Sequence, residues 1–331
     1  MLADVVIGLQ HGDEAKGKVT HHLCKNGDYT HVLRFNGGCN AGHTIYHEGR
    51  KFVTHHIPAG VFYGIKSVIG SGCVVNKEQF FKEIAELEEG GVDTKGLLFI
   101  AKNTHVITDA HLEEDGKDTK IGTTKRGNGP AYRDKYNRSG TLAKDDPELD
   151  EYVLDLYEEF HENEKVKVLC EGAQGVELDI DWGDYPYVTS SHCTTAGALL
   201  NAIPPSWISD VWGVGKVYET YVGAKNFEPL QPHFSKLREL GEEYGATTGR
   251  PRQCNWLDLT RIARAVKING VNKVVLNKVD VLRSLGVYRL IKDGAHVGFH
   301  SFDDMREYIE KELSTIDPEI KLYFSDRKDA I

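Results

Sequence analysis

A glycine-rich loop near the start of the chain has residue types and spacing that suit phosphate binding. Gly12, Gly17 and Lys18 fit the pattern GxxxxGK, in which backbone N–H groups surround phosphate oxygens. The usual loop continues with Ser or Thr, whose hydroxyl binds Mg²⁺, but here the next residue is Val19. If the loop holds a triphosphate, another oxygen ligand must hold the metal, and Asp13 lies inside the loop. The spacing alone fits a solvated turn about equally well.

The tetrapeptide Asn277–Asp280, NKVD, follows an apolar run and matches the pattern by which nucleotide-binding proteins read guanine. A carboxylate such as that of Asp280 accepts from two guanine N–H groups at once. Adenine offers no such pair, so a buried carboxylate would lose a charged hydrogen bond. Together with the phosphate loop, the motif favours GTP as the phosphoryl donor over ATP or dATP.

Five further loops are rich in glycine and in hydrogen-bond donors or acceptors. One is followed by the cations Arg133, Lys135 and Arg138, an arrangement that suits a monophosphate. Another carries two threonines and two arginines, which suits carboxylate recognition. Taken singly, each could be an ordinary polar loop. The five loops are Gly37–Thr44, Gly122–Pro130, Glu171–Gly175, Tyr185–Ser191 and Gly245–Arg252.

The elements that must position these loops alternate along the chain. Strand-like apolar runs cover Asp4–Gly8, His31–Phe35, Ser67–Ile69, Val166–Cys170, Val211–Val217 and Lys273–Leu276. Helical spacing covers Lys77–Glu89, Asp150–Glu164, Leu257–Ile268 and Asp303–Leu313, and a mobile loop is expected over Glu113–Lys120. This alternation predicts an α/β fold with a mostly parallel central sheet, helices on both faces and a P-loop-like phosphate loop. We expect one domain, residues 1–331, with a crevice beyond the carboxyl edge of the sheet.

Composition excludes several classes of protein. The formal net charge of −10 argues against a nucleic-acid binder. No apolar run approaches the roughly 20 residues that a membrane helix needs. The N-terminus lacks the basic flank and apolar core of a secretory signal, and the 6 cysteines are scattered. We therefore expect a cytoplasmic enzyme with reduced thiols and no nucleic-acid or membrane partner.

Seven motifs in this order resemble the adenylosuccinate synthetase family, over the range from Val5 to the C-terminal Ser325–Ile331. The motifs are GDExKGK, NAGHT, GTTxRGxGPAYRDK, EGAQG, YPYVTSS, ATTGRxR and the KVD segment. The short chain looks like the archaeal branch and more so like its phage relatives, which join aspartate to dGMP on the route to 2-aminoadenine DNA.

The resemblance implies a ligase that works in two steps. Asp13 would take the ring proton from position one of the purine and bind Mg²⁺, with the Gly42 carbonyl completing the metal shell. The six-oxygen would attack the γ-phosphate of GTP, and His43 would donate to the leaving β-phosphate side. Aspartate would then displace the phosphate. Activating the oxygen first splits one hard step into two easier ones, and donors and Mg²⁺ stabilise the charge.

The resemblance also implies three overlapping ligand sets, with Asp13, His43 and Gln174 as the catalytic residues. The GTP set is Gly12, Glu14, Ala15, Lys16, Gly17, Lys18, Gly42, Thr44, Arg252, Asn277, Lys278 and Asp280. The set for the acceptor monophosphate is Asp13, Asn40, Ala41, Thr123, Thr124, Arg138, Gln174, Thr189, Val222 and Arg250. The L-aspartate set is Thr247, Thr248, Gly249, Arg250 and Arg252. Because the residue matching Arg138 crosses a dimer interface in the family, a homodimer is expected.

Four departures from the family pattern bear on the acceptor. Ala15 stands where glycine is usual, and Pro251 stands where an arginine is usual. The segment Val222–Pro229 replaces VGAGPFPT. The C-terminal loop on the guanine side, which usually contains Gly-Pro, is Tyr323–Asp326 here. They resemble the phage branch and favour dGMP as the acceptor. A phage enzyme would work in the cytoplasm of its host. Retention of Asp13 and NKVD indicates a GTP-using form between the two branches.

Two alternatives stay open. The first is ordinary adenylosuccinate synthetase, with IMP as the acceptor. The second is a guanine-nucleotide GTPase module, against which Val19 and the additional glycine-rich loops argue.

Overall fold

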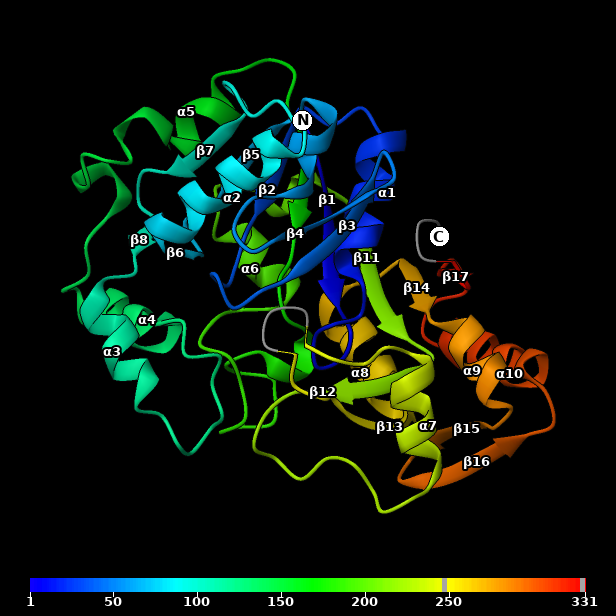
Figure 1. Ribbon diagram of the computed structural model, residues 1–331. Coiled ribbons are helices and arrows are strands. Elements are labelled where there is room, and N and C mark those ends of the chain that lie inside the picture. Colours follow the sequence, from blue (N-terminus) through cyan, green and yellow to red (C-terminus); the bar gives the residue numbers. More distant parts are fainter. Residues whose placement is uncertain (246–248, 328–330) are drawn as a thin grey trace.

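The computed structural model describes residues 1–245, 249–327 and 331. Its centre is a nine-stranded sheet whose neighbouring strands all run parallel (Figure 1). The strand order is β17 (Lys321–Phe324), β14 (Lys273–Asn277), β11 (Ile208–Lys216), β1 (Leu2–Gly8), β10 (Lys167–Glu171), β2 (His31–Arg34), β5 (Lys66–Ile69), β7 (Leu98–Ala101) and β9 (Val153–Leu154).

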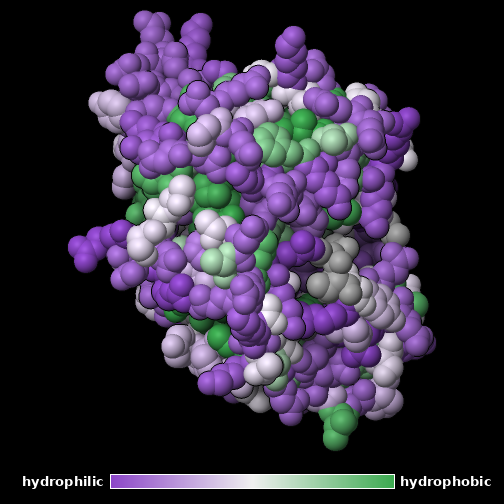
Figure 2. Space-filling model, turned by 60° about the vertical axis from the view of Figure 1, so that its left-hand side comes forward, coloured by the Kyte–Doolittle hydropathy of each residue, from purple (hydrophilic) through white to green (hydrophobic). Residues whose placement is uncertain are grey.

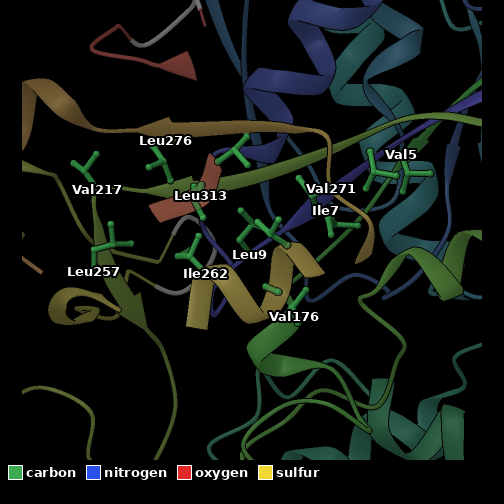
Figure 3. Packing of buried hydrophobic residues seen from close by; sticks show 14 of the residues in the cluster. Val5, Ile7, Leu9, Val176, Val217, Leu257, Ile262, Val271, Leu276 and Leu313 are labelled. Atoms are coloured by element: carbon green, nitrogen blue, oxygen red, sulfur yellow. The ribbon is translucent and has the colours of Figure 1, made fainter. Parts of the chain in front are cut away.

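Successive side chains of β1 enter two different hydrophobic cores, because neighbours on a strand point to opposite faces. Val5 and Ile7 belong to the larger core, whereas Val6 belongs to the other. Figure 3 shows Val5 and Ile7 in the larger core together with Ile262 and Val271. Burial of both faces explains why the central strands read as continuous apolar runs.

Helices supply the second layer on each face, which confirms the predicted fold class. The core that contains Val6 includes side chains of α1 (Lys16–Asn26) and α2 (Lys77–Glu89). The larger core includes side chains of α5 (Leu156–His161), α6 (Thr195–Leu199), α7 (His233–Leu240), α8 (Leu259–Asn269), α9 (Val279–Leu285) and α10 (Phe302–Ser314). The helices α3 (Asp109–Gly116) and α4 (Asn128–Asn137) pack mainly on each other.

Smaller elements complete the described chain. A mixed four-stranded sheet has the order β12 (Tyr218–Tyr221), β13 (Gln253–Asp258), β15 (Tyr288–Lys292) and β16 (Ala295–Phe299). Two further pairs are β3 (His43–His47) with β4 (Arg50–Thr54), and β6 (Val74–Val75) with β8 (His105–Val106). Short 3₁₀ helices cover Ala59–Tyr63, Ala143–Asp145, Asp150–Tyr152, Val176–Leu178 and Pro205–Trp207.

Two expectations about elements were wrong. The segment Asp150–Glu164 is not one helix, because Val153 and Leu154 form β9 and extend the sheet beside β7. Asp155 then starts α5 by accepting a hydrogen bond from the Tyr157 amide. The segment Glu113–Lys120 is not wholly a loop, because its first four residues end α3.

The surface agrees with the composition. The face shown in Figure 2 is mainly hydrophilic, with smaller and separate hydrophobic areas. Within the described part of the chain, each helix is too short or too polar to cross a membrane.

Candidate active site

The carboxyl ends of the central strands open into one cavity of about 900 Å³. Loops that follow parallel strands meet at the same edge of the sheet, so residues far apart in sequence come together there. The candidate residues that line the cavity are Gly12, Asp13, Glu14, Ala15, Lys16, Gly17, Lys18, Asn40, Ala41, Gly42, His43, Thr44, Thr123, Thr124, Gln174, Thr189, Val222, Arg250, Arg252, Asn277, Lys278 and Asp280.

Two of the described candidates are not among the residues that line the cavity. Arg138 is exposed at the end of α4, and Gly249 does not line the cavity. Thr247 and Thr248 lie outside the described residues. Their expected roles toward the acceptor nucleotide and aspartate therefore remain predictions.

The phosphate loop is held in shape by Glu14. Its carboxylate accepts hydrogen bonds from the Gly12 amide at 2.8 Å and the Gln10 amide at 3.2 Å, and it pairs with Lys16 Nζ at 2.6 Å. A side chain at Gly8 would come within 2.6 Å of the same carboxylate oxygens. The Glu14 side chain thus holds the loop in shape from inside.

Val19 has no side-chain oxygen that could take the place of the metal-binding hydroxyl, and its side chain is buried in the core that contains Val6. Asp13 and Gly42, by contrast, both line the cavity and offer a carboxylate and a carbonyl oxygen. These are the hard oxygen donors that Mg²⁺ prefers. The donor chemistry of these two residues therefore fits the expected metal.

Asp13 already has a cationic partner. Its Oδ2 lies 2.8 Å from Nε of Arg252, and Nη1 of that arginine lies 2.5 Å from Oε2 of the buried Glu243. Lys216 Nζ and the Tyr218 hydroxyl also contact Glu243, at 3.2 and 2.6 Å. Burial opposes ionisation of Glu243, but the Lys216 and Arg252 charges lower its pKa to about 2. The carboxylate anchors Arg252 at the cavity wall.

A second buried ion cluster lies behind His43. Its Nδ1 is 2.6 Å from Oε1 of Glu171, which also pairs with Arg34. Burial, followed by the Arg34 charge, lowers the pKa of His43 to about 4. Burial opposes ionisation of Glu171, but the Arg34 and His43 contacts lower its pKa to about 2.

The loops proposed for the acceptor are connected by side-chain hydrogen bonds. Gln174 Nε2 donates to Oδ1 of Asn40 at 3.2 Å. The Asp118 carboxylate accepts from the amides of Gly122 and Thr123, at 3.0 and 3.4 Å. Arg250 Nη2 donates to the Gly122 carbonyl at 3.4 Å. These contacts join four separate segments in two pairs, and residues of all four line the cavity.

The NKVD motif is joined directly to the phosphate loop. Asn277 Nδ2 donates to the Glu14 carbonyl at 2.8 Å, and Lys278 Nζ donates to the Gly241 carbonyl at 2.8 Å. Asp280 lies in the first turn of α9, exposed at the cavity. A base held by Asp280 and phosphates held by the loop would therefore occupy adjoining parts of one cavity.

Sequence reasoning missed several residues of this site. His11 is buried at the cavity. Its ring packs edge-on against the ring of Phe227, with the two ring centroids 4.9 Å apart. Burial alone would lower its pKa, but Asp184 and Glu219 raise it to about 9. No local spacing marks His11 or Glu243, because their partners come from distant segments. Glu171, however, stands inside the EGAQG motif and could have been found there.

The chain is similar in sequence to adenylosuccinate synthetases. A family model described as adenylosuccinate synthetase matches residues 5–146 and 141–291. The adenylosuccinate synthetase of Chlorobium chlorochromatii is 40% identical to this chain. The match covers 86% of this chain and 77% of that protein.

Two solved structures share the fold. The fully ligated adenylosuccinate synthetase from Plasmodium falciparum matches with a TM-score of 0.83 and 28% identity, over 97% of this chain and 96% of that chain. The cyanophage S-2L succinoaminodeoxyadenylate synthetase, bound to dGMP and to dATP as an energy donor, matches with a TM-score of 0.76 and 22% identity. That match covers 97% of this chain and 91% of the cyanophage chain.

Proposed function

Because the chain belongs to the adenylosuccinate synthetase family, we propose that it uses GTP to join L-aspartate to the six position of a purine 5′-monophosphate. The family consists of ligases that form a C–N bond, and this chain is such a ligase. The observation that carries the finer proposal is the meeting of the phosphate loop, the NKVD motif and the donor-rich loops in one cavity.

In the proposed reaction, Asp13 takes the proton from position one of the purine, and the six-oxygen attacks the γ-phosphate of GTP. One P–O bond forms as the bond from the γ-phosphorus to the leaving GDP breaks. His43 meets the phosphates on the leaving side, and Gln174 holds the purine. The amine of aspartate then replaces the phosphate on carbon six, so one C–N bond forms as one C–O bond breaks. Preorganised donors, held in place by the buried ion pairs of Glu171 and Glu243, stabilise the charge that develops.

Mg²⁺ would be held by Asp13 and the Gly42 carbonyl and would supply charge neutralisation for the transferred phosphoryl group. GTP would be bound through the phosphate loop and Asp280. Arg250 and Arg252, with Thr247, Thr248 and Gly249, would bind the aspartate carboxylates.

We further propose dGMP as the acceptor. The segment 222–229, which departs from the family pattern, contacts the acceptor side of the cavity: the Ala224 amide donates to the Ile121 carbonyl, and Phe227 packs on His11. An added 2-amino group needs both room and a partner, so changes here suit a different base. IMP is the second candidate, because relatives at 40% identity are named adenylosuccinate synthetases.

The test is turnover of the purified protein with GTP, Mg²⁺, L-aspartate and, separately, dGMP, GMP or IMP. Mass spectrometry of the succinyl nucleotide identifies the product, and phosphate release gives the rate. A higher kcat/KM with dGMP is expected, whereas equal or higher efficiency with IMP would reject dGMP. GTP hydrolysis without aspartate and acceptor would support a GTPase module instead.

Two expectations about assembly complete the proposal. Residues 1–331 act as a single domain, since the residues that line the cavity run from His11 to Arg327. The active form is a homodimer in which Arg138 of each subunit serves the acceptor site of the other. The position of Arg138 on the surface supports this role, and the molar mass in solution tests it.

A further inference from the structure

Glu171 begins the EGAQG motif, and the proposed function gives its side chain no role. It ends β10, and its side chain has 0% exposure to solvent. Oε1 faces Arg34 Nη2 and lies 2.6 Å from Nδ1 of His43, while Oε2 accepts from the Ala59 amide at 2.9 Å. The carboxylate therefore contacts one candidate catalytic side chain directly.

These contacts decide which nitrogen of His43 carries the proton in the neutral ring. Nδ1 also lies 3.0 Å from Nη2 of Arg34, which can only donate, whereas the Glu171 carboxylate can only accept. One ring nitrogen cannot do both, and the shorter contact to the ionised carboxylate favours Nδ1–H donating to Glu171. Among the described residues, none hydrogen-bonds to Nε2 of His43. His43 lines the cavity, and its Cβ lies close to Gly17 of the phosphate loop.

We propose that Glu171 is a positioning residue that holds His43 in the Nδ1–H tautomer and presents Nε2 to the phosphates. This inference rests on the proposed function, in which His43 meets the phosphates of GTP. Arg34 in turn balances the charge of Glu171.

A spectroscopic test reads the tautomer without needing turnover. Protein labelled with ¹⁵N-histidine is examined by NMR at neutral pH, and the His43 signals are identified by their loss in His43→Gln. The expected spectrum has Nδ1 protonated and Nε2 unprotonated in the wild type. In Glu171→Gln the share of the Nε2–H tautomer rises, because an amide is a weaker acceptor and can present a donor to Nδ1. A wild-type His43 protonated on Nε2 would overturn the proposal, whether or not the variant folds.

Glu83→Gln is a matched control. Glu83 is another buried carboxylate, and it accepts from the amides of His56 and Ile57, three and two residues before Ala59. A role of Glu171 that merely anchors the 56–59 segment predicts the same change in both variants. The positioning role predicts an altered His43 tautomer in Glu171→Gln alone, and equal changes in the two would contradict it.

Kinetics supply the second readout. Glu171→Gln should lower kcat by about tenfold or more, with the KM for GTP changed by less than about threefold. In a His43→Gln background the same change should lower kcat no further, and an equal additional loss would show that Glu171 acts apart from His43. If no purine monophosphate is turned over, the proposed function fails while the NMR result still decides the tautomer.

Discussion

The carboxylate of Asp13 is proposed to act as the base that takes the proton from the purine. Its side chain is 36% exposed and touches Arg252, so it is open to the cavity and close to a cation. We expect Asp13→Asn to lower kcat by about 100-fold or more, because an amide takes no proton from the purine. Initial rates of succinyl nucleotide formation measure the loss, and an unchanged thermal midpoint shows an intact fold. Turnover near the wild-type rate would remove Asp13 from the role of base.

Asp280 is proposed to read the base of the phosphoryl donor. In Asp280→Asn one acceptor becomes a donor, a pattern that suits the 2-oxo group of xanthine better than the 2-amino group of guanine. The variant should lose GTP efficiency by about 10-fold or more and gain activity with XTP. The measurement is kcat/KM for GTP, XTP and ATP with the same acceptor. An unchanged GTP-to-ATP preference would show that guanine is read elsewhere.

At the scale of elements, the turn between β1 and α1 contains an unusual residue. Ala15 has φ 68° and ψ 39°, the left-handed region that favours glycine, and its methyl group is exposed. Ala15→Gly should therefore raise the free energy of unfolding by about 1 kcal/mol, since the strain of the methyl group is released. Urea unfolding of the two proteins tests this, and a lower stability of the variant would show that the methyl group contributes packing instead.

The loop after α3 depends on one side chain for its shape. Asp118 accepts from the amides of Gly122 and Thr123, which places Thr123 at the cavity. Asp118→Ala should raise the KM for the acceptor monophosphate about tenfold while the thermal midpoint changes little, because the loop loses order without loss of core. Glu113→Ala, on the exposed surface of α3, is the control and should leave KM unchanged. Equal effects of the two changes would contradict the ordering role.

Sequence patterns predict elements well where burial is strong on both faces. The six apolar runs correspond to β1, β2, β5, β10, β11 and β14, and the period of Lys77–Glu89 gives the bounds of α2. The short β9 was missed because its two residues, Val153 and Leu154, also fit a helical period and only the contact with β7 decides between them. The small mixed sheet was also missed, since β16 mixes glycine, histidine and apolar residues without a clear alternation.

In the site, residues that belong to local motifs could be predicted from the sequence, whereas residues whose partners lie far away in the chain could not. The loops that line the cavity carry local glycine patterns, and so most of their residues could be named from the sequence. The roles of Glu243 and His11 depend on charges brought together from separate segments, which no spacing records. Arg138 matched a motif, yet in a single chain it lies on the surface.

For the whole molecule, buried carboxylates tie stability to pH. Glu171 and Glu243 have pKa values of about 2, below the ordinary value of 4.5. A lowered folded-state pKa stabilises the protein above about pH 4.5, and that contribution, on the order of 3 kcal/mol for each group, is lost as the pH falls toward 2.

We therefore expect the free energy of unfolding to drop as the pH falls from about 4.5 to about 2. Glu243→Gln should be less stable at neutral pH and should lose less over this interval, because one of the two linked groups is gone. Urea titrations at several pH values measure both slopes. Equal slopes for the wild type and the variant would show that Glu243 does not contribute to the acid sensitivity.

The contact between Asp13 and Arg252 has a consequence for the order of events under the proposed roles. The guanidinium that is to receive the amino acid substrate now shields the carboxylate that is to begin the reaction. An arriving dicarboxylic acid competes for that cation, so filling the last subsite also unlocks the base. Under these roles, GTP is not cleaved while the amino acid is scarce, and phosphoryl transfer begins only when all three substrates are bound.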